Sequence, residues 1–271
     1  MATYDIRPLQ LRMLKILLAF DNVCKTHDLH YCIMAGTMIG AIRHKGFIPW
    51  DDDMDVGMPR PDYEKFIAHC KEWIPAPYEF VCGENDEVYP LPFGKIQDAS
   101  TTLIERKHLS YLGGIYVDIF PLDGVPTNTW KRRMHYATYE FYKQVLYLLC
   151  RDPYKHGRGP SSWIPLLCRN FFTLKGVQLK IRRILNKYDY DKCELAADYT
   201  DGLRGVMSKK INGNYAPYEF EGETVEGIKL YDEYLTQIYG DYMQIPKGDH
   251  QRQHNFYYLD LNKPYREYKE Q

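Results

Sequence analysis

The sequence predicts an α/β fold in which a mixed sheet is flanked by helices. Apolar residues repeat at helical spacing over residues 7–26, and short apolar, strand-like stretches recur between residues 30 and 120. Of the 271 residues, 45% are hydrophobic and 26% are charged. That balance is typical of a folded soluble protein and argues against wholesale disorder or a fibrous repeat. The length favours one elaborated domain, or a core with a smaller lobe.

The first predicted elements are a helix, a short strand and a second helix. The apolar stripe that predicts the helix over 7–26 consists of Leu9, Met13, Ile16, Leu17, Phe20 and Cys24. A short strand is expected over 30–35. Gly36 and Thr37 then open a short helix that ends at about His44.

Residues 53–56 alternate polar and apolar side chains, as a strand with one buried face does. Pro61 suits the first turn of the next helix, which runs to about Trp73. Further strands are expected over 78–82, 93–97, 102–105 and 114–120. Pro121 and the turn residues after it should end the last of these strands. We therefore expect a first lobe over 1–125.

The remainder, residues 126–271, is expected to form a mainly helical second lobe. Within it, residues 131–187 contain 13 Lys or Arg but only two acids, a formal balance of +11. Such asymmetry indicates an anionic partner or surface, although a solvated basic face beside an acidic lobe would look the same. Helical periodicity returns over 230–239, with Gly240 as a C-cap. No structure is assigned to 252–271.

Several classes of protein are disfavoured by composition. The formal net charge is −1, and no recognised nucleic-acid-binding motif accompanies the basic segment, so no nucleic-acid partner is expected. No targeting segment is visible, and no window reaches the roughly 18 apolar residues that span a bilayer. Seven cysteines lack zinc-ligand spacing and are expected to be free thiols in a reducing compartment. A cytoplasmic location is therefore expected.

The aspartates carry the chemistry. Asp51, Asp52, Asp53 and Asp55 lie close together and repel one another unless cations neutralise them. On a strand over 53–56, Asp53 and Asp55 would project from one face and form a natural bridge for Mg²⁺ or Mn²⁺. Asp118 lies within an apolar strand, where a buried carboxylate needs a partner or a metal.

These parts together indicate phosphoryl chemistry. Gly36 and Thr37 lie at a helix start, where backbone N–H groups favour phosphate. An Asp-x-Asp strand and a third carboxylate would hold two metals over a phosphoryl group. The alternatives are a calcium-type site or solvated acidic loop for Asp53 and Asp55, a buried salt bridge to an Arg for Asp118, and a plain helix cap for Gly36 and Thr37. The arrangement resembles the nucleotidyltransferase superfamily of polymerase-β-like enzymes.

A closer resemblance covers one continuous stretch. Residues 35–56, AGTMIGAIRHKGFIPWDDDMDV, and then 58–66, MPRPDYEKF, resemble the LicD family. Members are phosphocholine transferases that decorate bacterial teichoic acids and lipooligosaccharides, and fukutin-type ribitol-phosphate transferases are relatives. Weaker likeness extends to 94–102, 114–123 and 234–242, whereas the basic middle is not covered.

The resemblance implies a reaction and its metal ligands. CDP-choline would be the donor, an acceptor sugar hydroxyl would attack the choline-bearing phosphorus in line, and CMP would leave. Positioning and charge neutralisation do most of such catalysis. Asp53 and Asp55 would be ligands of Mg²⁺ or Mn²⁺. Asp118 would be a further ligand, or the base that takes the acceptor proton.

The resemblance also implies phosphate-binding residues and partners. Gly36 and Thr37 would bind the diphosphate. Lys95 and Arg43 are candidate phosphate clamps, with a plain surface lysine as the alternative for Lys95. The acceptor would be a lipid-linked anionic glycan, which implies peripheral contact with the inner face of a membrane.

Two other functions stay open at this point. Relatives with the same motif use other donors, so CDP-ribitol, CDP-glycerol or a nucleoside triphosphate could replace CDP-choline. A binding module that kept the fold and lost turnover is the third hypothesis. The complete Asp-x-Asp pair together with Asp118 speaks against it.

Overall fold

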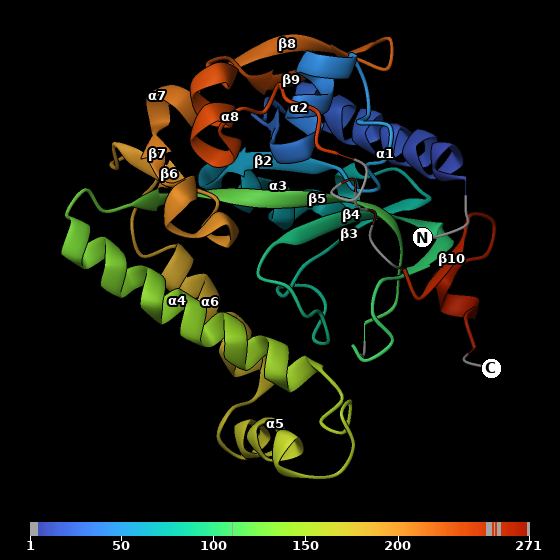
Figure 1. Ribbon diagram of the computed structural model, residues 1–271, viewed down its shortest axis with the longest axis vertical. Helices are drawn as coiled ribbons and strands as arrows, with labels where there is room; N and C mark the ends of the chain where they lie inside the picture. Colours follow the sequence, from blue (N-terminus) through green and yellow to red (C-terminus); the bar gives the residue numbers. More distant parts are fainter. Residues whose placement is uncertain (1–4, 110, 248–250, 252, 254–255, 270–271) are drawn as a thin grey trace.

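The computed structural model describes residues 5–109, 111–247, 251, 253 and 256–269. In this part of the chain the strands form one ten-stranded mixed sheet (Figure 1), so the predicted mixed α/β architecture is confirmed. Its main path runs β10-β4-β5-β2-β1-β9-β8. Off this path, β3 pairs with β4, and β6 links β5 to β7.

The elements fall into two runs along the chain. The first run is α1 (Ile6–His27), β1 (Cys32–Ile33), α2 (Ala35–His44), β2 (Asp55–Pro59), α3 (Arg60–Trp73), β3 (Tyr78–Val81), β4 (Gly94–Ile104) and β5 (Gly113–Val125). The second run is α4 (Thr129–Cys150), α5 (Pro160–Phe171), α6 (Leu174–Leu185), β6 (Leu195–Ala197), η1 (Tyr199–Gly205), β7 (Met207–Ser208), α7 (Lys209–Asn212), β8 (Tyr215–Phe220), β9 (Glu223–Ile228), α8 (Tyr231–Tyr239), β10 (Tyr258–Asp260) and η3 (Tyr265–Glu267).

The predicted helices over 7–26, 61–73 and 230–239 are confirmed as α1, α3 and α8. Asp5 caps α1 by accepting from the Arg7 N–H, and the apolar stripe of α1 is buried. Gly240 ends α8 with φ of 71°, a left-handed conformation that glycine adopts without strain. The helix α2 begins at Ala35, one residue before the predicted start.

Three strand predictions need correction. The strand β2 begins at Asp55 and not at residue 53. The two strands expected over 93–97 and 102–105 are one strand, β4, whose pairing with β5 shifts between Asp98 and Leu103. The strand β5 also continues through Pro121 to Val125.

Pro121 fits inside β5 because that strand has a single neighbour at this point. The ladder to β4 ends at Ile119, and the ladder to β6 begins at Asp123, whereas β2 pairs with β5 throughout this stretch. A proline removes one ladder donor and is tolerated where one side of the strand is open. The prediction that this strand ends at Pro121 was therefore wrong.

The second half of the chain adds helices and then returns to the sheet. Helices α4, α5 and α6 lie below the sheet in Figure 1, with a smaller apolar core between α4 and α6. The hairpin β8–β9 pairs with β1 through Gly227 and Ile33, and β10 pairs with β4 at the other end of the path. The expected mainly helical character therefore holds for residues 129–185, whereas the residues after them contribute strands β6 to β10 to the sheet.

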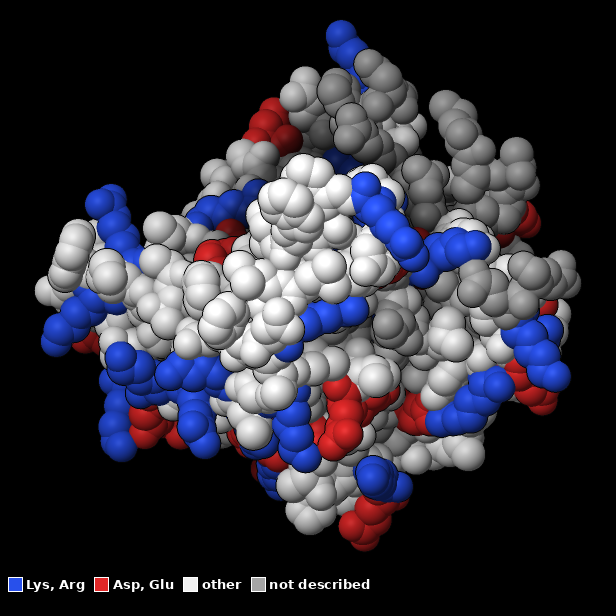
Figure 2. Space-filling view, turned by 90° about the horizontal axis from the view of Figure 1, so that it is seen from below, with Lys and Arg blue, Asp and Glu red and all other residues white. Residues whose placement is uncertain are grey.

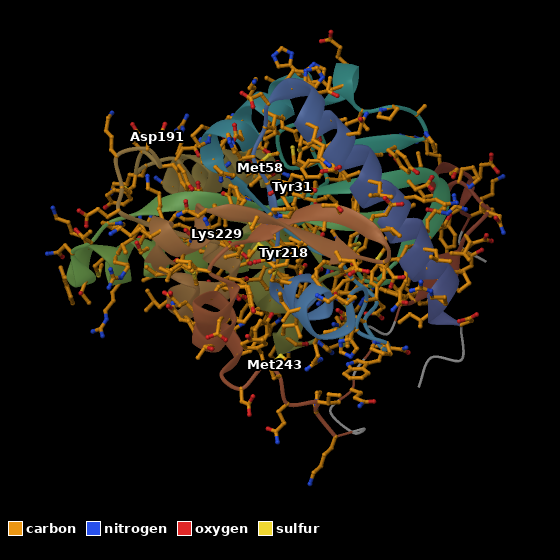
Figure 3. All side chains as sticks on the ribbon, turned by 90° about the horizontal axis from the view of Figure 1, so that it is seen from above. Tyr31, Met58, Asp191, Tyr218, Lys229 and Met243 are labelled. Atoms are coloured by element: carbon orange, nitrogen blue, oxygen red, sulfur yellow. The ribbon has the colours of Figure 1, made fainter. Side chains whose placement is uncertain are left out.

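Tyr31 fastens the returning hairpin to the first half of the chain. It is 2% exposed and lies between α1 and the hairpin (Figure 3). Its hydroxyl donates to Asp21 of α1 at 2.7 Å and accepts from the N–H of Glu226 at 3.4 Å. Because residues 215–228 complete the sheet, the division at residue 125 stays a prediction.

Two further expectations concern the cysteines and the C-terminal end. All seven cysteines are unpaired and five are buried, as the sequence predicted. Residues 258–260 and 265–267, to which no structure was assigned, form β10 and η3. Within the described ranges, no helix has the length and apolar character needed to cross a membrane.

Candidate active site

Two aspartates lie side by side on the central strands. The strands β2 and β5 run parallel, and Asp55 is in register with Asp118. Residues in register on neighbouring strands project from the same face, so the two carboxylates meet on one side of the sheet. The Asp118 N–H donates to the carbonyl of Met54 at 2.9 Å, which extends the pairing ahead of β2.

Asp53 lies just before β2, and so it does not share a strand face with Asp55 in the way the sequence predicted. The alternation nevertheless holds, because Met54 and Val56 are fully buried and Asp53 and Asp55 are only partly so. The charge of Asp53 raises the pKa of both Asp55 and Asp118, which places the three carboxylates in one neighbourhood.

Burial and mutual repulsion oppose ionisation in this group. Burial, followed by the charges of Asp53 and Asp118, raises the pKa of Asp55 well above its usual value. Burial raises the pKa of Asp118 to about 7, although the ammonium of Lys95 acts against this shift. Without a metal, Asp55 and Asp118 therefore ionise at a higher pH than ordinary aspartates do.

The residues present suit a hard cation. Carboxylate oxygens are the ligands that Mg²⁺ prefers, and Oδ1 of Asp118 is buried with no hydrogen bond, although the Lys95 ammonium lies 3.4 Å from it. A cation would neutralise the repulsion and occupy that oxygen. Across the described residues, however, no three His, Cys, Asp or Glu side chains are already gathered as a metal site. Asp55 and Asp118 are the preassembled pair, and Asp53 stands beside them.

Lys95 is part of the same row across the sheet. It is in register with Asp118 on β4 and is 2% exposed, so a plain surface lysine is excluded. Its Nζ lies 2.7 Å from Glu105 Oε1, 3.4 Å from Asp118 Oδ1 and 3.2 Å from the ring centre of Tyr116. These contacts hold a fixed positive charge next to Asp118. A direct phosphate contact stays a prediction.

The start of α2 lies next to the aspartates. Met34 supplies no side-chain cap for the first-turn N–H groups, and that of Ala35 donates to the Tyr234 hydroxyl at 3.1 Å. A Cβ at Gly36 would lie 3.1 Å from Oδ2 of Asp51, which shows how closely that carboxylate approaches the turn. Thr37 is buried, and its Oγ1 accepts from the Asp55 N–H at 2.9 Å. Thr37 thus positions Asp55, and diphosphate binding here stays a prediction.

Arg43 makes hydrogen bonds to a distant part of the chain that the sequence did not predict. Its Nη1 donates to the carbonyls of Tyr242 at 2.8 Å and Gln244 at 3.4 Å. Burial lowers its pKa, while the charge of Asp51 acts in the opposite direction. Arg43 therefore ties the last turn of α2 to the segment after α8, and its role as a phosphate clamp stays a prediction.

The family model described as "LicD/FKTN/FKRP, nucleotidyltransferase domain" matches residues 28–156. The lipopolysaccharide cholinephosphotransferase LicD of Haemophilus influenzae is 30% identical over 266 residues, covering 94% of this chain and 97% of that protein. The chain belongs to the LicD family.

Two shorter likenesses are to uncharacterised proteins. One from Rickettsia typhi is 41% identical over 90 residues, which are 26% of this chain and 27% of that protein. One from Rickettsia prowazekii is 41% identical over 54 residues, which are 18% of this chain and 20% of that protein. The LicD family match at 28–156 includes every site residue predicted from the sequence.

Two residues near these aspartates were not predicted from the sequence. Asp198 caps η1, accepts from Thr200, and contributes to the raised pKa of Asp55. Burial raises the pKa of Asp198 to about 7. Tyr239, at the end of α8, has a raised pKa to which the charges of Asp55 and Asp51 contribute after burial. The family-like segment 234–242 was a signal for Tyr239, whereas Asp198 had none.

A neighbouring aspartate takes the structural role that was considered for Asp118. Asp123 is 1% exposed and accepts from Arg60 Nε at 2.6 Å and from Nη2 at 2.8 Å. Since it lies five positions after Asp118, an odd number, it projects from the opposite face of β5. The buried carboxylate–arginine pair in this LicD family member therefore joins α3 to β5 and leaves Asp118 with Lys95.

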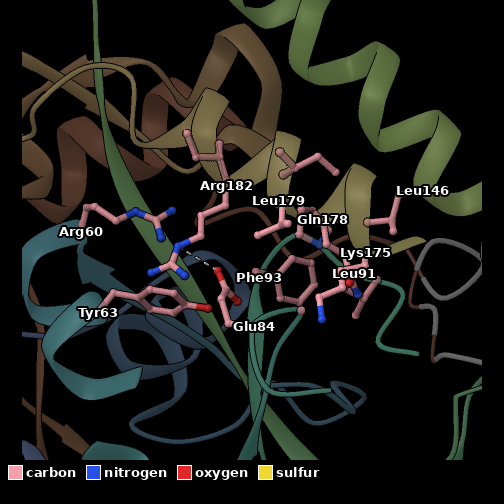
Figure 4. A pocket seen from close by; sticks show the side chains of 14 residues that line it. Arg60, Tyr63, Glu84, Leu91, Phe93, Leu146, Lys175, Gln178, Leu179 and Arg182 are labelled. Carbon is pink, nitrogen blue, oxygen red and sulfur yellow. Dashed lines mark ion pairs between the residues drawn. The ribbon is translucent and has the colours of Figure 1, made fainter. Parts of the chain in front are cut away.

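A pocket adjoins this part of the sheet, between α3, the 83–93 loop and α6 (Figure 4). Its wall includes Leu91, Phe93 and Leu179, and the Arg182–Glu84 ion pair of 3.5 Å lies at one side. The ring of Phe93 packs 4.3 Å from that of Phe120, two residues along β5 from Asp118. Through Phe93, the pocket therefore borders β5 close to Asp118 along the strand.

Proposed function

We propose that this chain transfers phosphocholine from CDP-choline to a sugar hydroxyl of a cell-surface glycan precursor, a lipooligosaccharide or a teichoic acid, and releases CMP. The observation that carries the proposal is the in-register pair Asp55 and Asp118 within a LicD family member. The Haemophilus influenzae relative, which covers nearly the same length, bears the name of a cholinephosphotransferase.

In the proposed reaction, the acceptor oxygen forms a bond to the choline-bearing phosphorus. The bond from that phosphorus to the oxygen shared with CMP breaks, and CMP leaves with the electron pair. Asp53 and Asp55 would hold Mg²⁺ or Mn²⁺, which would neutralise the phosphoryl oxygens when bound. Asp118 would hold the same cation or take the acceptor proton.

The surroundings of Asp118 suit the second of these roles. Its pKa of about 7 is near the operating pH at which a general base is most effective. Lys95 at 3.4 Å stabilises the ionised form and limits the shift that burial causes. A base with this environment would accept a hydroxyl proton and remain near its neighbours during transfer.

The first test is metal-dependent release of CMP from CDP-choline, measured with Mg²⁺ or Mn²⁺ and with EDTA. We expect Asp55→Asn and Asp53→Asn to lower the rate by at least about 100-fold, since interactions made in the transition state are lost. Asp191→Asn is the matched control, because Asp191 lies on an exposed loop at the surface (Figure 3). Metal-independent release in the wild type would contradict the proposal.

The donor and the role of Asp118 need separate measurements. A panel of CDP-choline, CDP-ribitol, CDP-glycerol and nucleoside triphosphates identifies the donor, and release from one of the others alone would replace CDP-choline. If Asp118 is the base, Asp118→Asn loses activity but keeps its affinity for Mn²⁺. Loss of both would assign Asp118 to the cation. Saturable CDP-choline binding with no release on any acceptor would indicate a binding module.

A further inference from the structure

Helix α5 presents its apolar side to solvent. Trp163, Leu167 and Phe171 follow one another at four-residue spacing and are 67%, 58% and 75% exposed, and Ile164 beside them is 62% exposed. The residues that α5 buries are Ser162 and Pro165. A surface helix of a globular protein ordinarily buries its apolar stripe and exposes its polar one. The reversed pattern indicates a surface that has a partner.

The position of α5 is fixed by the rest of the molecule. Nη2 of Arg169 donates to the carbonyls of Leu149 at 3.2 Å and Arg151 at 2.9 Å, which joins α5 to the end of α4. The ring of Phe172, which follows α5, lies 6.3 Å from that of Phe141 on α4. The four exposed side chains are therefore carried by a supported helix, and this helix lies at the lower end of the molecule in Figure 1.

The surroundings of this apolar face are basic. The segment 131–187 carries 13 Lys or Arg and two acids. Glu140 is paired with Lys143 at 2.6 Å, and Asp152 accepts from the Tyr154 N–H at 2.9 Å. Figure 2, seen from below, shows uncharged surface flanked by Lys and Arg side chains. Lys155 and Arg158, in the loop before α5, are exposed.

We propose that α5 docks on an anionic lipid bilayer, with Trp163, Ile164, Leu167 and Phe171 in the interface and the basic side chains around them on the headgroups. Apolar side chains with a cationic surround bind bilayers through both the buried area and the attraction to anionic lipid. Tryptophan favours the interface itself. Charge complementarity favours a membrane over a second copy of the chain, because a two-fold contact here would set two basic surfaces against each other.

Sedimentation with vesicles tests this surface independently of the transfer reaction. The wild type is expected to bind vesicles of phosphatidylcholine and phosphatidylglycerol, and to bind pure phosphatidylcholine weakly. Replacing Trp163→Gln together with Phe171→Gln should lower the partition coefficient at least about tenfold. The control is Leu11→Gln with Val88→Gln, which replaces residues of 42% and 49% exposure outside this face and should change nothing.

Two further measurements make the outcome decisive. Lys155→Gln with Arg158→Gln should weaken binding to the anionic vesicles several-fold and make it less sensitive to salt. Brominated lipid should quench wild-type fluorescence, and Trp163→Phe should remove most of that quenching. All variants are compared by near-UV circular dichroism and melting temperature, so that loss of fold is recognised.

Three results would overturn the proposal. The first is no binding of the wild type to anionic vesicles. The second is equal binding by the Trp163→Gln, Phe171→Gln variant. The third is a dimer of the wild type in sedimentation velocity that this variant abolishes, which would assign the face to a second copy of the chain. Absence of CMP release by the wild type, with vesicle binding intact, would contradict the proposed function and leave the docking surface in place.

Discussion

Lys95, Asp118 and Asp55 occupy matched positions on three adjacent strands, so charges of both signs are held in one buried row. Lys95 is shared between Glu105 and Asp118, and Asp55 has acidic neighbours on several sides. Uncompensated buried charge is costly, and a protein that retains it uses stability to keep reactive groups in place. Burial and neighbouring carboxylates oppose the ionisation of Asp55 and Asp118, and a bound cation would stabilise their ionised forms.

The pH dependence of stability follows from Asp118. Its pKa is raised from an ordinary 3.8 to about 7, so between these values the folded chain keeps a proton that the unfolded chain releases. In EDTA, the contribution of Asp118 to the free energy of unfolding should therefore be largest below pH 3.8. It should fall by at most about 4 kcal/mol as the pH rises through 7.

Urea unfolding across this pH range measures the effect. Asp118→Asn cannot ionise, so its contribution should not vary with pH, and the variant should be more stable than the wild type in EDTA at pH 8. Saturating Mg²⁺ should reduce the difference. Parallel curves for the wild type and Asp118→Asn would show that Asp118 ionises normally, and Asp191→Asn serves as the exposed control.

Among the elements, β2 and β5 are positioned by side chains from helices. Thr37 on α2 accepts from the backbone of Asp55 at the start of β2, and Arg60 at the start of α3 binds Asp123 near the end of β5. These contacts join each strand of the central pair to a helix, one at each end of the pairing. The separation of the aspartates thus depends on the placement of α2 and α3 as well as on the ladder.

Removing the Thr37 hydroxyl should affect both stability and activity. In Thr37→Val the partly buried Asp55 N–H loses its acceptor, which costs about 1–3 kcal/mol of unfolding free energy. Because Asp55 would then shift, CMP release should fall as well. Thr37→Ser keeps the hydroxyl and should restore most of both quantities. Equal loss in the Val and Ser variants would mean that the methyl packing, and not the hydrogen bond, is what matters.

The Arg60–Asp123 pair gives a test of how α3 is held. Arg60→Met leaves a buried carboxylate unpaired and should cost about 3–5 kcal/mol in urea unfolding. Adding Asp123→Leu removes that carboxylate and should recover most of the loss. The more exposed Arg182, which pairs with Glu64, is the control, and Arg182→Met should cost less than about 1 kcal/mol. A double variant no better than Arg60→Met would contradict the pairing.

Across the whole molecule, the sheet is assembled from both ends of the chain. The strand β1 has two residues and lies between β2 and β9, so its outer neighbour comes from residues after 222. Phe220, Val225 and Ile228 of the hairpin belong to the same buried core as α1 and β5. The first half of the chain therefore cannot bury its own core without the last quarter.

A fragment containing residues 1–125 should accordingly not fold by itself. Without the hairpin, β1 becomes an exposed edge, and without β10 the outer part of β4 loses its partner. We expect weak near-UV circular dichroism and no cooperative urea transition for the fragment, whereas the full chain shows both. A sharp transition in the fragment would establish the lobe boundary at residue 125 that the sequence predicted.

The local features of this protein were determined by the sequence. Helical periodicity defined α1, α3 and α8, and the stretch over 35–56 indicated the LicD family, while the cation expected from the acidic cluster stays a prediction. Each of these depends on neighbours in the chain, where spacing and side-chain type fix the structure. The path of β5 through Pro121 was mispredicted, because proline's effect depends on which strands lie beside it.

The tertiary structure decided which distant residues meet. Register alone placed Lys95 next to Asp118, since a shift of one residue would turn either side chain to the other face of the sheet. Long-range contacts likewise engaged Arg43 with the segment after α8, brought Asp198 and Tyr239 near Asp55, and left the apolar face of α5 outward. Sequence patterns report what each segment prefers, and only the packed fold decides which partner satisfies that preference.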